Sequence, residues 1–156
     1  KKIIIRRTGD YILGNIDESG YYFSNNVFVS IPKDTQTNLF FYLGVINSRL
    51  MTWYYRTSQP RVGKLFAEIK INLINQLPIS NFNLSVPKDK QIHDTIVSLV
   101  DTMLETQKLF RKSKNETDNK FHKQKIDIID KQINALFYKL YVLTEEEIKV
   151  VEGEKN

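Results

Sequence analysis

Short apolar runs alternate with turn-forming residues over the first 31 positions of the chain. The runs are rich in β-branched and aromatic residues, and clusters of Gly, Asn, Asp and Ser separate them. Apolar runs bounded in this way are typical of short antiparallel strands. The pattern therefore predicts strands at residues 3–5, 11–16, 21–23 and 27–31.

A helical period replaces this alternation between residues 39 and 56. The apolar positions that recur at steps of four and three residues are Leu39, Leu43, Ile46, Leu50 and Trp53. Other apolar residues widen this face beyond a single stripe, which predicts one helix largely buried against the sheet. Arg49, Thr52 and Arg56 share the same spacing and are predicted to form one outward-facing ridge.

The segment between residues 57 and 87 is irregular. Pro60 and Gly63 interrupt the stretch TSQPRVGKLF at residues 57–66, which predicts a loop that leads into an extended stretch at 65–69. A short helical turn is expected to end at Leu77, because the residue before a proline is disfavoured in a helix. Residues 81–87 form the expected linker.

Two long helices with heptad spacing are predicted after this linker. The seam of the first is Ile92, Ile96, Leu99, Met103, Thr106 and Phe110. The seam of the second is Ile126, Ile129, Ile133, Leu136 and Leu140. Each helix has about 25 residues and is roughly 37 Å long, which suits a spacer arm. A short polar connection at 112–120 predicts that the two helices pack side by side and antiparallel. A capping box at 144–147 predicts a short last helix that ends before Gly153.

These elements predict an α+β fold: a small, mostly antiparallel sheet packed by a helix, then an antiparallel two-helix coiled-coil hairpin and a short C-terminal helix. We expect residues 1–86 to form a globular subdomain and residues 87–156 a helical spacer or docking hairpin. The chain starts at Lys1 rather than methionine, so we expect a piece of a longer polypeptide.

The net charge of +5 is concentrated in the first part of the chain. Ten Lys and Arg but only five Asp and Glu precede Pro87, whereas thirteen of each follow from that position. Five of the six arginines also lie before it. Because the planar guanidinium suits phosphates and guanine edges, this bias favours a polyanionic partner, although chance on a small sample is the alternative.

Composition narrows the classes of protein further. The chain has no cysteine, which excludes disulfides and thiolate metal sites and fits a reducing cytoplasm. It has no apolar run near the length of a membrane span and nothing that resembles a signal peptide. We therefore expect a cytoplasmic protein with no membrane partner.

Few residues offer catalytic chemistry. His93 and His122 have no cysteine and no helical histidine four residues away, so a metal site is not expected. No glycine-rich phosphate loop is present, and no Asn/Asp-Pro-Pro-aromatic stretch of the kind that holds a flipped base. Asp34, Glu68 and Lys70 can be fitted to the pattern of metal-dependent nucleases, but Glu68 to Lys70 fits a plain amphipathic strand equally well, and we favour the strand.

A series of blocks along nearly the whole chain resembles a known family. The blocks are KIIIRRTGDYI, GYYFSNNVFVSIPKD, LGVINSRLMTWYYR, GKLFAEIKINLINQLPI and, after a helical pair, LYVLTEEEIKVVEG. In this order they resemble the TaqI-like C-terminal specificity domain of DNA methyltransferases and of type IIG restriction enzymes. The layout is also similar to half of a type I specificity subunit.

The resemblance implies a module that recognises a DNA target for a restriction-modification enzyme. It implies a parent with an S-adenosylmethionine-dependent domain that methylates adenine N6, possibly fused to an endonuclease. The family's catalytic motif and cofactor loop are missing here, so this chain is not expected to be an enzyme. Such domains usually have a segment before the KIIIR block, so part of the reading surface is expected to be missing, and a prokaryotic, cytoplasmic location is implied.

Adjacent arginines near the first turn are candidate DNA contacts. Strand alternation puts Arg6 and Arg7 on opposite faces, so we expect one to reach DNA beside Thr8 and the other to pair with a carboxylate. The sequence leaves open which does which. Asp10, Asp17 and Glu68 are the candidate carboxylates.

The loop at 57–64 is the stronger candidate for reading bases. It carries Ser58, Gln59, Arg61 and Lys64, which offer hydrogen-bonding groups for base edges and cations for phosphates. Arg49 and Arg56 of the predicted ridge support it. A solvated crossover loop is the alternative.

The expected partners are double-stranded DNA and a methyltransferase domain, either of the same polypeptide or of a partner subunit. A second interpretation is a structural or assembly module, in which the coiled coil is the working part and self-associates. Salt-dependent duplex binding by residues 1–86 favours the first interpretation. Concentration-dependent dimerisation without DNA binding favours the second.

Overall fold

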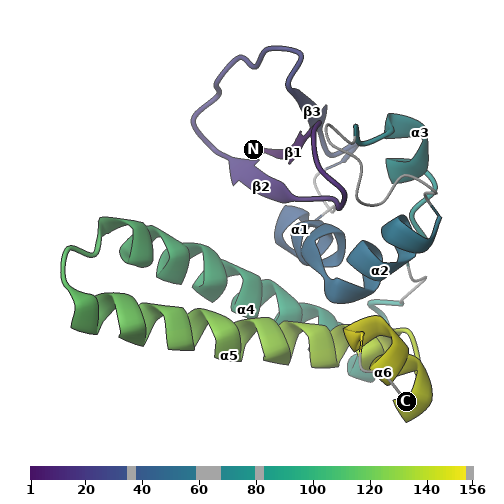
Figure 1. Cartoon of the computed structure of the whole chain (residues 1–156). Coiled ribbons are helices and arrows are strands. Elements are labelled where there is room, and N and C mark those ends of the chain that lie inside the picture. Colours follow the sequence, from purple (N-terminus) through teal and green to yellow (C-terminus); the bar gives the residue numbers. More distant parts are fainter. Residues whose placement is uncertain (35–37, 59–67, 80–82, 154–156) are drawn as a thin grey trace.

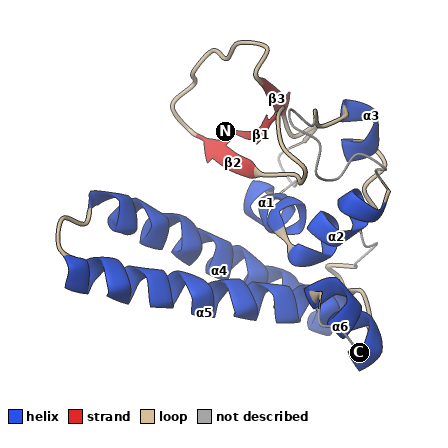
Figure 2. Ribbon diagram, viewed as in Figure 1, coloured by secondary structure: helices blue, strands red, loops and turns tan. Residues whose placement is uncertain are grey.

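The computed structural model describes residues 1–34, 38–58, 68–79 and 83–153. Figure 1 shows a small sheet and several short helices at one end of the molecule, with a long helical hairpin that projects from them. Figure 2 shows the same division by type of element, because the strands gather in one place and the rest of the regular structure is helical. The predicted α+β fold is confirmed.

The sheet has three antiparallel strands in the order β2-β1-β3. Strand β1 is Lys2–Arg6, β2 is Gly14–Asp17 and β3 is Val27–Ser30. Because β1 is central, its residues Ile3 and Ile5 point into the core and are almost completely buried. The residues that alternate with them along the strand, Ile4 and Arg6, lie on the other face of the sheet. There they line a groove beside the helical hairpin.

The expected strand at 21–23 was wrong. Both edges of β1 are occupied by β2 and β3, and this segment forms part of the long connection between them. Its contacts are with a side chain instead: Lys2 Nζ donates to the carbonyl of Tyr21 and lies 5.0 Å from the centre of the Phe23 ring. Phe23 thus packs beside a lysine, whereas the side chains of Tyr21 and Tyr22 are exposed.

The single helix predicted at 39–56 is in fact two helices, α1 (Leu39–Asn47) and α2 (Arg49–Thr57). They are separated by Ser48, whose backbone is extended. The Ser48 hydroxyl donates to the carbonyl of Val45 and accepts from the backbone N–H of Met51, so it caps the second helix. One residue interrupts the helix without disturbing the apolar period, which is why the period did not reveal the break.

The helical hairpin consists of α4 (Pro87–Lys112) and α5 (Glu116–Leu140), which run antiparallel in Figure 1. The connection between them was predicted too long, because Asn115 accepts from the Asp118 N–H and starts α5 directly. Before the hairpin lies the short helix α3 (Ile71–Ile74). After it lies α6 (Glu145–Glu152), which has the predicted capping box at Thr144 and ends at left-handed Gly153.

Helix α1 joins the sheet and the hairpin in one core. Its buried residues face both sides, and a Cβ added at Gly44 would lie only 3.0 to 3.4 Å from Val100, Phe137 and Ile96 of the hairpin. Ile96 and Ile133 of the predicted seams are buried, but so are Val100 and Phe137 beside them. The buried face is wider than a heptad seam because α4 packs on α1 as well as on α5.

Within the described residues, no helix has the length and apolar character that crossing a membrane requires.

Ile96→Asp should destabilise the chain strongly. The side chain is completely buried, so the variant places an unpaired charge among apolar groups at a cost on the order of several kcal/mol. Ile128→Asp is the matched control, because Ile128 of α5 is 57% exposed and its replacement should change the free energy of unfolding by less than about 0.5 kcal/mol. Urea unfolding followed by circular dichroism measures both. If the two variants were equally stable, Ile96 would not be a buried core residue.

Candidate nucleic-acid interface

The end of strand β1 is held close to two other parts of the chain. The backbone N–H of Arg7 donates to Asn26 at 3.0 Å, and its carbonyl accepts from Ile69 N–H at 2.8 Å. Thr8 forms an isolated antiparallel bridge with Glu68. Residues 68–69, which come after α2 in the sequence, thus lie at the turn after β1.

Charged and aromatic side chains gather at this point. We call them the β1-end cluster, and its members are Arg6, Arg7, Asp10, Tyr11, Arg56, Glu68 and Lys70. They come from β1, the turn after it, the last turn of α2 and the bridge at Glu68.

Arg6 lies against the turn that follows it. Its guanidinium carbon is 4.1 Å from the centre of the Tyr11 ring, and Nη2 donates to the Tyr11 carbonyl at 3.3 Å. A Cβ at Gly9, where φ is +143°, would lie 2.6 Å from Arg6 Nη2, so only glycine leaves room for the arginine there. Among the residues that the structure describes, no carboxylate lies within ion-pair distance of Arg6.

Arg56 approaches the same ring from α2. Its Nη2 is 2.8 Å from Asp10 Oδ2, and its guanidinium carbon is 5.4 Å from the Tyr11 centroid. One ring therefore serves two cations, through the favourable interaction of a guanidinium with an aromatic face. Asp10 offsets only part of their charge.

Arg7 is the arginine that pairs with a carboxylate. Its Nη2 lies 3.1 Å from Glu68 Oε1, and Nη1 donates to the carbonyl of Asn25 at 3.1 Å. Lys70 Nζ lies 3.4 Å from the other oxygen of Glu68. The hydrogen bond from Lys70, together with the charges of Arg7 and Lys70, lowers the pKa of the Glu68 carboxyl.

The β1-end cluster therefore contains four cations and two carboxylates. Exposed hydroxyl residues Thr8, Thr57 and Ser58 lie in the same turn and at the end of α2. The predicted residues Gln59, Arg61 and Lys64 lie outside the described part of the chain. The structure describes the surroundings of five predicted site residues at this end of the sheet. They are Arg6, Arg7, Thr8, Arg56 and Ser58.

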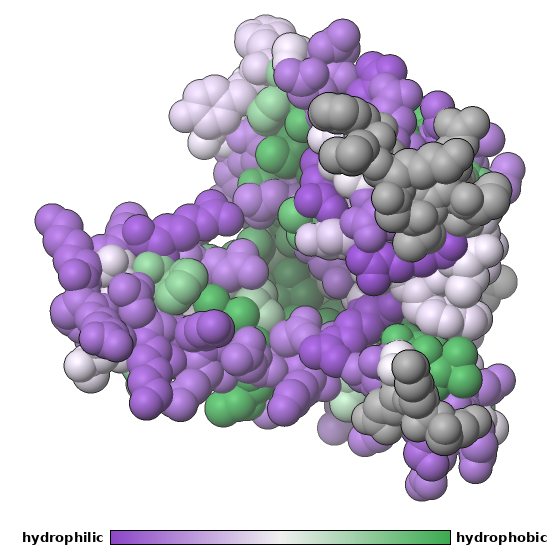
Figure 3. Space-filling model, viewed as in Figure 1, coloured by the Kyte–Doolittle hydropathy of each residue, from purple (hydrophilic) through white to green (hydrophobic). Residues whose placement is uncertain are grey.

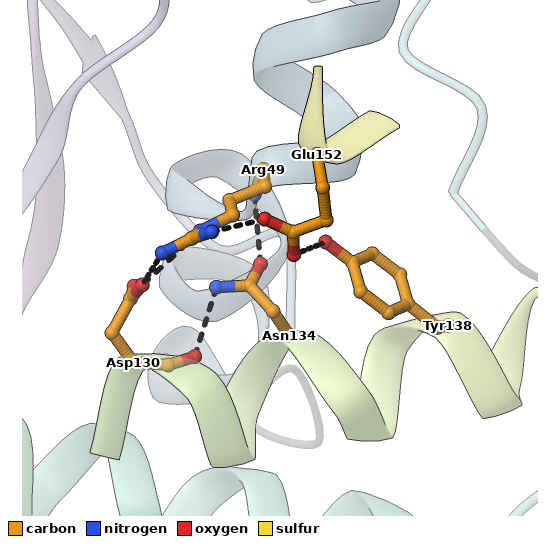
Figure 4. Close-up of polar contacts among 5 residues, drawn as sticks. All are labelled: Arg49, Asp130, Asn134, Tyr138 and Glu152. Atoms are coloured by element: carbon orange, nitrogen blue, oxygen red, sulfur yellow. Dashed lines mark hydrogen bonds and ion pairs between the residues drawn. The ribbon is translucent and has the colours of Figure 1, made fainter. Parts of the chain in front are cut away.

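Arg49, the other predicted site residue, lies elsewhere. It begins α2, and its guanidinium contacts Asp130 of α5 and Glu152 of α6 (Figure 4). Arg49 and Arg56 share a helix but sit at opposite ends of it, beside different carboxylates.

Sequence reasoning missed three structural partners of these arginines. Tyr11 was assigned to a strand, although it lies in the turn beneath Arg6 and Arg56. Asp130 and Asn134 were not singled out, because they lie beside the apolar seam of α5 rather than in it. A buried Asn next to a seam is a signal that could have been noticed, since a buried amide needs hydrogen-bond partners.

Within the described residues, no group of three or more His, Cys, Asp or Glu side chains is arranged to hold a metal ion.

Glu68→Gln should destabilise the chain near neutral pH and have no effect in acid. The folded-state pKa of Glu68 lies below the ordinary value of 4.5, so the ionised carboxylate contributes stability above that value. This contribution is lost as the pH falls through the folded-state pKa. Thermal unfolding of both chains over a pH series measures the difference, which should shrink to zero in acid. Replacing Lys112, at the far end of α4, by Met is the control and should give a difference that does not follow this titration.

The first half of the chain matches a known family model, described as the TaqI-like C-terminal specificity domain, over residues 1–79. The match contains all three strands, helices α1 to α3 and the whole β1-end cluster, and it ends before α4. A search of curated proteins found no match to the chain. Because the family model covers half of the 156 residues, the chain belongs to the family of TaqI-like C-terminal specificity domains.

Proposed function

We propose that this chain recognises the DNA target of a restriction-modification enzyme, and that it does so with the β1-end cluster and the loop at 57–64. The family match over residues 1–79 carries this proposal. The charge distribution supports it, because the excess of arginine lies in the matched segment. Two of these arginines, Arg6 and Arg56, meet over Tyr11, and Arg7 lies beside Arg6 at the end of β1.

The arginines of the cluster fit the role of phosphate contacts. Arg6 is stacked on Tyr11 without a carboxylate partner among the described residues, so its charge is available to a phosphate. Arg56 and Arg7 are oriented by single exposed carboxylates, and exposed ion pairs of this kind contribute little and are readily exchanged. Stacking and ion pairing also reduce the side-chain freedom that is lost when a phosphate binds.

Residues of the loop at 57–64 fit the role of base reading. Gln59 and Arg61 have the side-chain types that form paired hydrogen bonds with adenine and guanine edges, and Lys64 suits a phosphate. Thr8 and Ser58 offer hydroxyl groups that can form hydrogen bonds with a base edge or with a phosphate. Arg49 is not included in the proposed surface, because its guanidinium is occupied by two carboxylates, Asp130 of the hairpin and Glu152 of α6.

The parent protein that we propose is a site-specific adenine-N6 DNA methyltransferase, with or without a fused endonuclease, in the cytoplasm of a prokaryote. S-adenosylmethionine would bind its catalytic domain, and no residue of this chain is assigned to the cofactor or to the reaction. The helical hairpin would dock on that domain or on a partner subunit.

Self-association through the hairpin is the second candidate function. Leu109, Phe121 and Ile128 are each more than half exposed on α4 and α5, which favours a protein contact on this arm. Sedimentation at increasing concentration tests it. A dimer that does not bind duplex DNA would favour the assembly function and contradict target recognition.

Arg56→Gln and Asp10→Asn should change DNA affinity in opposite directions. Loss of Arg56 removes a phosphate contact, so binding to every duplex should weaken and the salt dependence should fall by about one unit of slope. Loss of Asp10 frees Arg56 from its carboxylate and removes a negative charge, so binding should strengthen. Fluorescence anisotropy with a mixed-sequence duplex over a salt series measures both.

Lys108→Met is the control for these variants, since Lys108 pairs with Glu105 within α4 and should not affect binding. Equal effects of Arg56→Gln and Lys108→Met would contradict the proposed surface.

Variants of the loop should separate affinity from selectivity. Lys64→Ala should weaken binding to all duplexes alike. Arg61→Ala or Gln59→Ala should cost roughly 1 to 3 kcal/mol on the preferred sequence and relax the preference at one position. Selection from a random duplex pool, followed by affinity measurements, distinguishes the two classes. Unchanged affinity and selectivity in the triple variant would show that the loop is only a connection.

A further inference from the structure

Arg49 is the centre of a polar cluster that joins the two parts of the molecule (Figure 4). Its Nη2 lies 3.0 Å from Asp130 Oδ2 on α5, and Nη1 contacts Glu152 on α6. Its own backbone N–H donates to Asn134 Oδ1 at 2.8 Å. One residue of α2 thus binds three residues of the C-terminal helices.

The partners of Arg49 are held in place by further bonds. Asn134 is buried, and its Nδ2 donates to the Asp130 carbonyl at 2.8 Å, which fixes the orientation of its amide. Tyr138 donates its hydroxyl to Glu152 Oε1 at 2.5 Å. Burial first, and then this hydrogen bond, raise the pKa of the Tyr138 hydroxyl, so it remains a donor at neutral pH. The Glu152 carboxylate and the Asn134 amide are therefore themselves oriented.

The charge of Arg49 is unfavourable where it stands unless carboxylates balance it. It is the first residue of α2, where the free backbone N–H groups make the helix end positive. Asp130 and Glu152 offset that charge, and Asn134 satisfies one of the free N–H groups. The Arg49 side chain is 44% exposed, about as much as that of Arg56, so what sets it apart is the number of its partners: two carboxylates and one amide against one carboxylate.

The hairpin needs such a contact, because a groove separates it from the sheet beyond α1. The groove has a volume of about 660 Å³. Ile4 and Leu13 lie on its sheet side, and Leu104 and Phe110 on its hairpin side. Figure 3 shows green, apolar surface in the hollow between the arm and the upper part of the molecule. Closing the groove would bury apolar surface, so the open angle must be maintained by contacts at the base of the hairpin.

Two kinds of contact are present at that base, and they differ in what they can fix. The apolar packing of α1 on α4 and α5 favours association but is not directional. Hydrogen bonds, including those from a guanidinium to a carboxylate, have defined lengths and angles. The polar cluster, in which the partners of Arg49 come from α5 and α6, is the directional one.

We infer that Arg49 is a positioning residue which, with Asp130, Asn134 and Glu152, fixes the angle between the sheet and the helical hairpin. A partner docked on the hairpin then stands at a constant position relative to the β1-end cluster. This last consequence rests on the proposed function, whereas the fixed angle does not.

Distance measurements between spin labels test the angle. The chain has no cysteine, so Ser30→Cys on β3 and Lys120→Cys on α5 provide two unique labelling sites, both exposed. Double electron–electron resonance should give one narrow distance distribution in the otherwise unchanged chain. Arg49→Met should broaden the distribution or shift its mean, and Arg49→Lys, which keeps the charge, should restore part of the narrow form. An unchanged distribution in Arg49→Met would overturn the inference.

Two further variants serve as controls, one for misfolding of Arg49→Met and one for the loss of a charged side chain elsewhere on the hairpin. Glu152→Gln removes one carboxylate but keeps an acceptor for Tyr138, so it should fold even where Arg49→Met does not, and it should also broaden the distribution. Lys112→Met removes an exposed cation at the far end of α4 and should leave the distribution unchanged. A broadening as large in Lys112→Met would contradict a specific role for Arg49.

Duplex binding by the same proteins separates this inference from the proposed function. Arg49→Met should bind a mixed-sequence duplex with the affinity and salt dependence of the unchanged chain. Weaker binding and a smaller salt slope, with an unchanged distance distribution, would overturn the inference and identify Arg49 as a DNA contact. If the unchanged chain itself does not bind duplex DNA, the proposed function fails while the distance measurement still decides the inference.

Discussion

The burial of α1 on two sides is the constraint on which the rest of the structure depends. A helix that is apolar around most of its circumference must be covered by more than one layer. Here β1 and β2 cover one side, and α4 and α5 cover the other, where Gly44 allows the helices to approach closely. The sheet that carries the β1-end cluster and the hairpin that projects from it therefore share one core, although they come from opposite halves of the sequence.

What the sequence could predict is the part of the structure set by local signals. The capping box at Thr144 depends on neighbouring residues and was predicted where it occurs. The start of α4 was not, because Pro87, its first residue, was assigned to the linker. The apolar periods also predicted that Ile96 and Ile133 would be buried. The break at Ser48 was missed because it rests on one hydroxyl bonded to Val45 and Met51, and Ser is common inside helices as well as at their ends.

The candidate site could be predicted less well than the fold, because its contacts join distant positions. The sequence showed that Arg6 and Arg7 must differ, since strand alternation places them on opposite faces. It could not show that Glu68, 61 positions later, returns to the end of β1 and pairs with Arg7. The partners of Arg49, Asp130 and Glu152, are 81 and 103 positions away in the sequence. The spacing within one helix therefore predicted an outward-facing ridge, and it could not show that Arg49 contacts two other helices.

The two ends of α2 show how one short helix can serve two purposes. Arg56 lies in its last turn, where the helix dipole favours a cation, so a single exposed carboxylate and the face of Tyr11 are enough to orient it. Arg49 lies in its first turn, where the dipole disfavours a cation, and it is balanced by two carboxylates, of which Glu152 is itself held by Tyr138. An arginine that binds a phosphate must be able to exchange its partner, whereas an arginine that sets an angle must not. The difference in their surroundings therefore supports the two proposals, recognition at the end of α2 nearest the sheet turn and orientation at the end nearest the hairpin.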